Sequence, residues 1–98
     1  MSLSGVVIDK TTKKPIEGVH LAVENAYYEG GDFDSYNGYD NKLIVTNKNG
    51  RFKIVFKKSA FIVMKASKSG YQQNLHTQEV YSNNIDLTLS MMSTGIAK

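Results

Sequence analysis

Hydrophobic and polar side chains alternate along several short segments of this chain. In residues 19–24, Val19, Leu21 and Val23 alternate with polar or small neighbours, and the same period of two recurs in 51–57 and 85–91. Successive side chains of a β-strand point to opposite faces, so this period predicts strands that bury one face. A stripe at helical spacing occurs nowhere in the sequence. The pattern therefore predicts an all-β protein.

Two further segments, 3–9 and 60–67, are apolar in both phases and rich in β-branched residues, which predicts central strands covered on both faces. A short strand is predicted at 43–46 and a more polar one at 71–80. Seven short strands separated by turn residues are typical of a sandwich. We therefore predict a seven-stranded antiparallel Greek-key β-sandwich forming a single domain over 1–98, with a loose C-terminal tail at 92–98.

Proline and glycine residues mark the predicted turns. Pro15 lacks a backbone N–H and so predicts a loop between the first two strands. The pair Asn49-Gly50 tolerates positive φ and predicts a tight hairpin between the strands at 43–46 and 51–57. Gly18 and Gly70 lie in two further turns.

Five short motifs follow one another in a characteristic order: LSGVVID at 3–9, KPIEGV at 14–19, TNKNGRF at 46–52, KSGY at 68–71 and IDLTL at 85–89. In order and spacing they resemble the carboxypeptidase regulatory-like domain, a member of the transthyretin-like (prealbumin-like) β-sandwich group. The resemblance implies a non-catalytic accessory or interaction module, often part of a larger bacterial protein that is periplasmic, secreted or on the cell surface.

A sister group of similar fold, the hydroxyisourate hydrolases, uses histidines near its first strand, an arginine and a C-terminal Tyr-Arg-Gly-Ser. Here the first strand has no histidine, Arg51 is the only arginine, and the chain ends in STGIAK. The resemblance therefore implies no catalytic residues. A small hydrolase that depends on His20 stays the less favoured alternative.

The composition excludes several kinds of chemistry. Without cysteine the chain has no disulfide, no thiolate zinc site and no cysteine nucleophile. His20 and His76 both lie in polar phases, and neither has a second histidine two residues away as a zinc site would favour. The longest apolar run, residues 60–64, is too short to span a membrane.

Charge is distributed unevenly along the chain. The net charge is +3, but residues 27–42 carry four acidic residues and one lysine, a local charge of −3 that leaves +6 elsewhere. Arg51, Lys53 and Lys57 share one strand face that has no interleaved aromatic residue. That face therefore does not predict nucleic-acid binding, and its lysines are better explained as protection of an exposed strand.

The segment 27–42 departs from the family pattern and is predicted to be an inserted loop. Its tyrosines and phenylalanine alternate with Gly, Asn, Asp and Ser, a composition found in loops that bind proteins or stack on sugars. A loop that only packs on itself is the other interpretation. The candidate contact residues for a protein or carbohydrate partner are Tyr28, Phe33, Tyr36 and Tyr39.

The same segment is the candidate calcium site. Carboxylates are the hard oxygen ligands that calcium takes, and several in one loop repel one another unless a cation neutralises them. The spacing is not that of an EF-hand, because Tyr36 occupies the fifth place and Gly38 falls one residue late. No other cofactor is predicted. The candidate ligands are Glu29, Asp32, Asp34 and Asp40.

Overall fold

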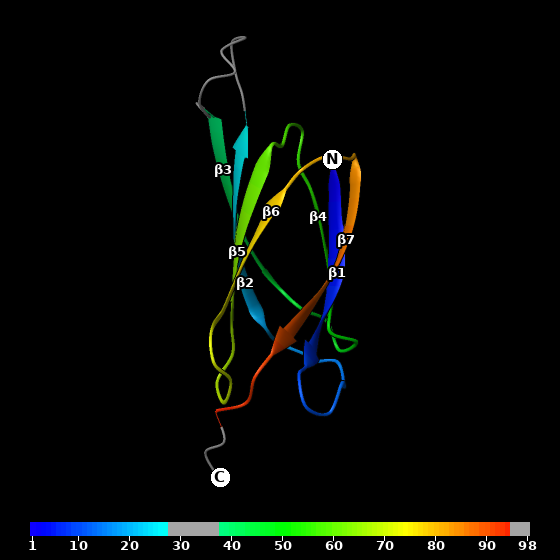
Figure 1. Cartoon of the computed structure of the whole chain (residues 1–98), viewed down its shortest axis with the longest axis vertical. Coiled ribbons are helices and arrows are strands. Elements are labelled where there is room, and N and C mark those ends of the chain that lie inside the picture. Colours follow the sequence, from blue (N-terminus) through cyan, green and yellow to red (C-terminus); the bar gives the residue numbers. More distant parts are fainter. Residues whose placement is uncertain (28–37, 95–98) are drawn as a thin grey trace.

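A computed structural model describes residues 1–27 and 38–94 of the chain. Within them seven strands form two layers, which lie side by side in Figure 1. The predicted all-β sandwich of seven strands is therefore confirmed. The strands are β1 (Ser2–Asp9), β2 (His20–Tyr27), β3 (Gly38–Val45), β4 (Arg51–Val55), β5 (Phe61–Ser67), β6 (Asn74–Glu79) and β7 (Asn84–Met91).

One sheet has the strand order β4-β1-β7 and the other β3-β2-β5-β6. Every pair of neighbours is antiparallel except β1 and β7, which run parallel from Ser2↔Asn84 to Asp9↔Met91. The prediction of antiparallel pairing is wrong for this pair. A parallel pair needs a long crossover, and here the five intervening strands provide it.

The core lies between the two sheets. Leu3 and Val7 of β1 face Leu21 of β2 and Ile62 of β5 across this interior, and all four are fully buried. Every second residue of β1 is only half-buried, however, and the corresponding residues of β5 are half-buried or, at Lys65, exposed. The prediction that both strands are covered on both faces is therefore wrong. Their β-branched residues suit the pleated strand itself and do not require a second covering layer.

The inserted loop is shorter than predicted. Strand β2 continues to Tyr27 and β3 begins at Gly38, and these two residues pair in register. The residues 38–42, predicted as loop, thus belong to a strand. Because β3 is an edge strand of its sheet, it tolerates exposed polar residues such as Asn41, which hide the period of two in the sequence.

The turn at 47–50 joins strands of different sheets, so the predicted hairpin between them is wrong. Gly50 has a φ of 70°, in the left-handed region that an Asn-Gly pair predicts. The side chain of Asn47 accepts hydrogen bonds from the N–H groups of Asn49 (2.9 Å) and Arg51 (3.0 Å). The turn is closed locally while the chain crosses from one layer to the other.

Thr46, at the start of this turn, is buried and links it to the segment before β2. Its hydroxyl donates to the Ile16 carbonyl (2.8 Å) and accepts from the Val19 N–H (2.9 Å). Its backbone N–H donates to the Val19 carbonyl (3.0 Å), and its carbonyl accepts from the Gly18 N–H (3.1 Å).

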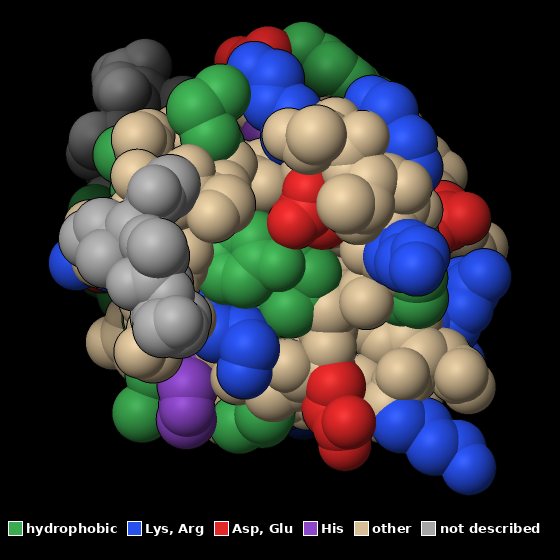
Figure 2. Space-filling model, turned by 90° about the horizontal axis from the view of Figure 1, so that it is seen from below, with side chains coloured by type: hydrophobic (Ala, Val, Ile, Leu, Met, Phe, Trp, Pro, Cys, Tyr) green, Lys and Arg blue, Asp and Glu red, His purple; other side chains and the backbone are tan. Residues whose placement is uncertain are grey.

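Figure 2 looks at this end of the sandwich, where Lys and Arg side chains are interspersed with acidic and polar ones.

Residues 92–94 are bound to the turn after β5. Gln72 N–H donates to the Met92 carbonyl (2.8 Å), and Thr94 N–H donates to the Gly70 carbonyl (3.1 Å). Residues 92–94 are therefore held in place, although the prediction assigned them to a loose tail at 92–98. Residues 95–98 lie outside the described part. Nothing in the described part of the chain forms a helix that could cross a membrane.

Asp9 ends β1 and fixes the loop that follows it. One carboxylate oxygen accepts the N–H groups of Thr11 (2.8 Å) and Thr12 (3.0 Å), and the other accepts the Tyr71 hydroxyl (2.9 Å). The Thr12 N–H, followed by the Tyr71 hydroxyl, lowers the pKa of Asp9 because these donors favour the charged carboxylate.

This lowered pKa predicts acid sensitivity. A carboxylate with a depressed folded-state pKa stabilises the fold above its unfolded pKa, and the contribution is lost as the pH falls through the folded pKa. We expect Asp9→Asn to lower the melting temperature at pH 7, with the difference from wild type shrinking as the pH falls from 7 to below the ordinary aspartate pKa of about 4. Melting curves across this range measure it, with the exposed Asp86→Asn on β7 as control. A difference that does not depend on pH would contradict the assignment.

Candidate binding surface

The two sheets differ in the side chains that they turn outward. The outward side of β4-β1-β7 is mostly polar, with Ser4 of β1 flanked by Lys53 of β4 and Asp86 of β7. The outward side of β3-β2-β5-β6, called the outer face below, carries exposed or half-buried apolar side chains on all four strands. Among the described residues, this is the surface best suited to bind an apolar partner.

Strand pairing places the outer-face residues in rows. Leu43, Ala22, Lys65 and Leu75 form one row across β3, β2, β5 and β6. The next row consists of Asn41, Glu24, Val63 and Thr77. Since paired residues on one face lie about 5 Å apart, side chains within a row are in mutual reach.

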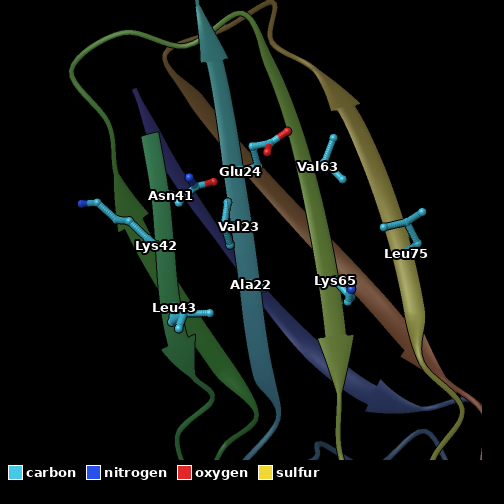
Figure 3. A pocket seen from close by; sticks show the side chains of 9 residues that line it. All are labelled: Ala22, Val23, Glu24, Asn41, Lys42, Leu43, Val63, Lys65 and Leu75. Atoms are coloured by element: carbon cyan, nitrogen blue, oxygen red, sulfur yellow. The ribbon is translucent and has the colours of Figure 1, made fainter. Parts of the chain in front are cut away.

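A shallow groove of about 650 Å³ runs across these rows (Figure 3). Leu43 is 82% exposed and Leu75 66% exposed, and they stand on the two edge strands of the sheet. Ala22 and Lys65 lie between them in the register, and the small side chain of Ala22 leaves the floor of the groove low on β2. Burying each leucine under a partner would contribute about 1.5–3 kcal/mol to the free energy of binding. The outer face therefore favours association.

Three charged side chains line the groove. Lys42 of β3 is engaged, because its Nζ donates to the Val55 carbonyl (3.2 Å). The other two are Glu24 and Lys65, both exposed. They stand on neighbouring strands, offset by one row, because Glu24 pairs with Val63 and Lys65 pairs with Ala22. In the described part of the chain neither has an ion-pair partner. Beside its apolar centre, the groove therefore offers one unpaired acid and one unpaired base.

Of the predicted contact residues, Tyr39 is described. It lies on β3 opposite Ala26, is 57% exposed and extends the outer face by one row toward the start of β3. Asp40, the described member of the predicted calcium ligands, lies on β3 and lines a separate hollow with Tyr27, Lys57 and Lys58. The other members of both sets lie outside the described residues: Tyr28, Phe33, Tyr36, Glu29, Asp32 and Asp34.

The histidines lie far apart in the strand register. His20 is exposed on β2 opposite Val45, and the His76 ring nitrogen Nε2 lies 3.3 Å from the Gln78 Oε1 on β6. Within residues 1–27 and 38–94, no three His, Asp or Glu side chains come together in a way that could hold a metal ion. Sequence reasoning did not identify Leu43 and Leu75, although Leu75 is a lone leucine in a polar segment and could have been noticed.

No protein-family model matches the sequence, and no curated protein is significantly similar to it. Solved structures do share its fold. The group B streptococcus pilus 2b backbone protein aligns with a TM-score of 0.70 and 14% identity over 96% of this chain and 41% of its own. The 3-chlorocatechol 1,2-dioxygenase from Rhodococcus opacus aligns with a TM-score of 0.64 and 13% identity over 95% of this chain and 59% of its own.

A third neighbour is the C-terminal domain of the shaft pilin SpaA from Lactobacillus rhamnosus GG, with a TM-score of 0.64 and 13% identity, covering 95% of this chain and 97% of that domain. These alignments define the class: the chain has the transthyretin-like β-sandwich fold. It spans less than two thirds of the pilus backbone protein and of the dioxygenase. At such low identity the likeness concerns the fold alone.

Proposed function

We propose that this chain is a non-catalytic β-sandwich module that binds another protein through its outer face. The observation that supports this best is the contrast between the two sheets. Leu43 and Leu75 are widely exposed on one outward side, whereas the other consists mostly of serines, threonines and charged residues, with Val55 exposed among them. Exposed apolar groups that share one groove and are bordered by charges are typical of a protein interface.

The setting that we propose is a larger bacterial protein at the cell surface. The sandwich corresponds to 41% of a pilus backbone protein and to 30% of a streptococcal ancillary pilin, so this fold occurs there as one part of a longer chain. The dioxygenase neighbours show that the fold also occurs in enzymes. For this chain the carboxypeptidase regulatory-like resemblance and the apolar groove favour an accessory role.

Nile red, a neutral dye whose fluorescence rises on apolar surfaces, tests the outer face. We expect the folded protein at low micromolar concentration to enhance its fluorescence. The double variant Leu43→Ser/Leu75→Ser should lose most of this enhancement while its melting temperature stays close to wild type, because both side chains lie outside the core.

Val55→Ser is the matched control, since Val55 is 58% exposed but lies on β4 in the other sheet. It should retain the enhancement of the wild type. The proposal would be wrong if the folded protein did not bind the dye, or if the control lost as much signal as the double variant.

A further inference from the structure

We infer that the outer face binds a second copy of this chain, with Glu24 of each copy against Lys65 of the other. The inference rests on the proposed function and adds the identity of the partner. It is supported by the placement of one unpaired acid and one unpaired base within the same apolar groove.

Four residues at the centre of the face define the geometry. Ala22 and Glu24 on β2 lie beside Lys65 and Val63 on β5, so that the charged pair forms one diagonal and the apolar pair the other. Figure 3 shows Glu24 and Val63 toward one end of the strands and Ala22 and Lys65 toward the other. Glu24 and Lys65 thus lie on opposite sides of the line through Ala22 and Val63, at mirror-related positions.

A two-fold axis lying in the face close to this apolar diagonal turns the face onto itself. It brings Glu24 of one copy to Lys65 of the other, and the same rotation forms the reciprocal pair, as an isologous interface requires. Residues close to the axis meet their own equivalents, so Ala22 and Val63 pack against themselves. A single rotation therefore satisfies both charges and buries the apolar centre.

The arrangement favours a second copy over a strongly acidic or basic partner. A polyanion would leave Glu24 opposed by like charge, and a polycation would do the same to Lys65. Glu79, at the margin of the face on β6, accepts a hydrogen bond from the Tyr81 hydroxyl and is already engaged. A partner with both signs at matching positions is supplied by the face itself.

The area of the outer face sets the expected affinity of the dimer. Four strands about 4.8 Å apart and three rows about 6.8 Å apart span roughly 20 by 20 Å, or about 400 Å² in plane per copy. This is at the small end of specific interfaces, where association is weak and transient. We therefore expect a dimer that dissociates in the micromolar range rather than an obligate one.

Sedimentation velocity across micromolar concentrations tests the inference. The wild type should shift from monomer to dimer as its concentration rises. Glu24→Lys should stay monomeric because it places two lysines opposite each other, and Lys65→Glu should do so because it opposes two glutamates. An equimolar mixture of these two variants should form a heterodimer, since both contacts then join opposite charges.

Lys53→Glu, a reversal on the outward side of β4-β1-β7, is the matched control and should dimerise like wild type. Melting curves of each variant verify folding. A wild type that stays monomeric, or variants that do not associate when mixed, would overturn the second copy as partner. If Nile red binding still depends on Leu43 and Leu75 in that case, the proposed interaction module stands. If that dependence is absent too, both ideas fail.

Discussion

Gly50→Val is expected to lower the free energy of unfolding by about 3–5 kcal/mol, which is a large share of the stability of a small domain. Two effects combine at this position. The φ of 70° is strained for a β-branched residue. A Cβ atom would also lie 2.7 Å from the Val7 carbonyl oxygen, 2.8 Å from Pro15 Cβ and 2.9 Å from the Ile16 nitrogen. Two of these three atoms are backbone, so the crowding has no easy relief.

Urea unfolding measures the loss, and Gly70→Val separates its two causes. Gly70 has a φ of 89°, but a Cβ placed there meets nothing within 4 Å. Its substitution should therefore cost only the backbone strain, about 1–2 kcal/mol. Equal losses at the two positions would show that crowding at Gly50 is unimportant. An unchanged midpoint for Gly50→Val would contradict the turn as described.

Thr46→Val is expected to lower the free energy of unfolding by about 2–5 kcal/mol, although it hardly changes the shape of the side chain. The substitution removes the hydroxyl that accepts from the Val19 N–H and donates to the Ile16 carbonyl. Both backbone groups belong to residues that are buried, so water cannot readily replace the lost bonds. The penalty comes from two buried polar groups without partners rather than from the loss of one favourable contact.

Thr46→Ser is the control for this prediction, because it keeps the hydroxyl and removes only a methyl group. Its cost should stay near 1 kcal/mol, in line with the loss of one buried methyl. Chemical unfolding of both variants gives the comparison. A serine variant that is destabilised as strongly as the valine variant would show that packing, and not hydrogen bonding, holds this segment.

Alternation in the sequence predicted β2, β4 and β7 well, because each buries one face against the other sheet and its pattern follows directly from that burial. Pairing was harder to predict. The parallel neighbours β1 and β7 lie at opposite ends of the sequence, and β3 and β4 separate into different sheets despite a turn suited to a hairpin. Turn chemistry is local, whereas the choice of partner depends on the whole sandwich.

The candidate surface was predictable only in part. The aromatic side chain of Tyr39 predicts a contact residue within a loop, whereas the structure places Tyr39 on the edge strand β3. Leu43 could not be recognised as exposed, because Leu43, Ile44 and Val45 are all apolar and the sequence does not say which phase faces solvent. That choice depends on which side of the sheet the second layer covers.

The parallel pair of β1 and β7 has a mechanical consequence. Strand β1 begins at one end of the sandwich and β7 ends at the other, with pairing from Ser2↔Asn84 to Asp9↔Met91 (Figure 1). A pull that separates these two ends slides the strands lengthwise past each other. The rungs of the ladder are then loaded together instead of being opened one by one like a zipper. The parallel pairing of β1 and β7 therefore makes the sandwich resistant to tension along its long direction.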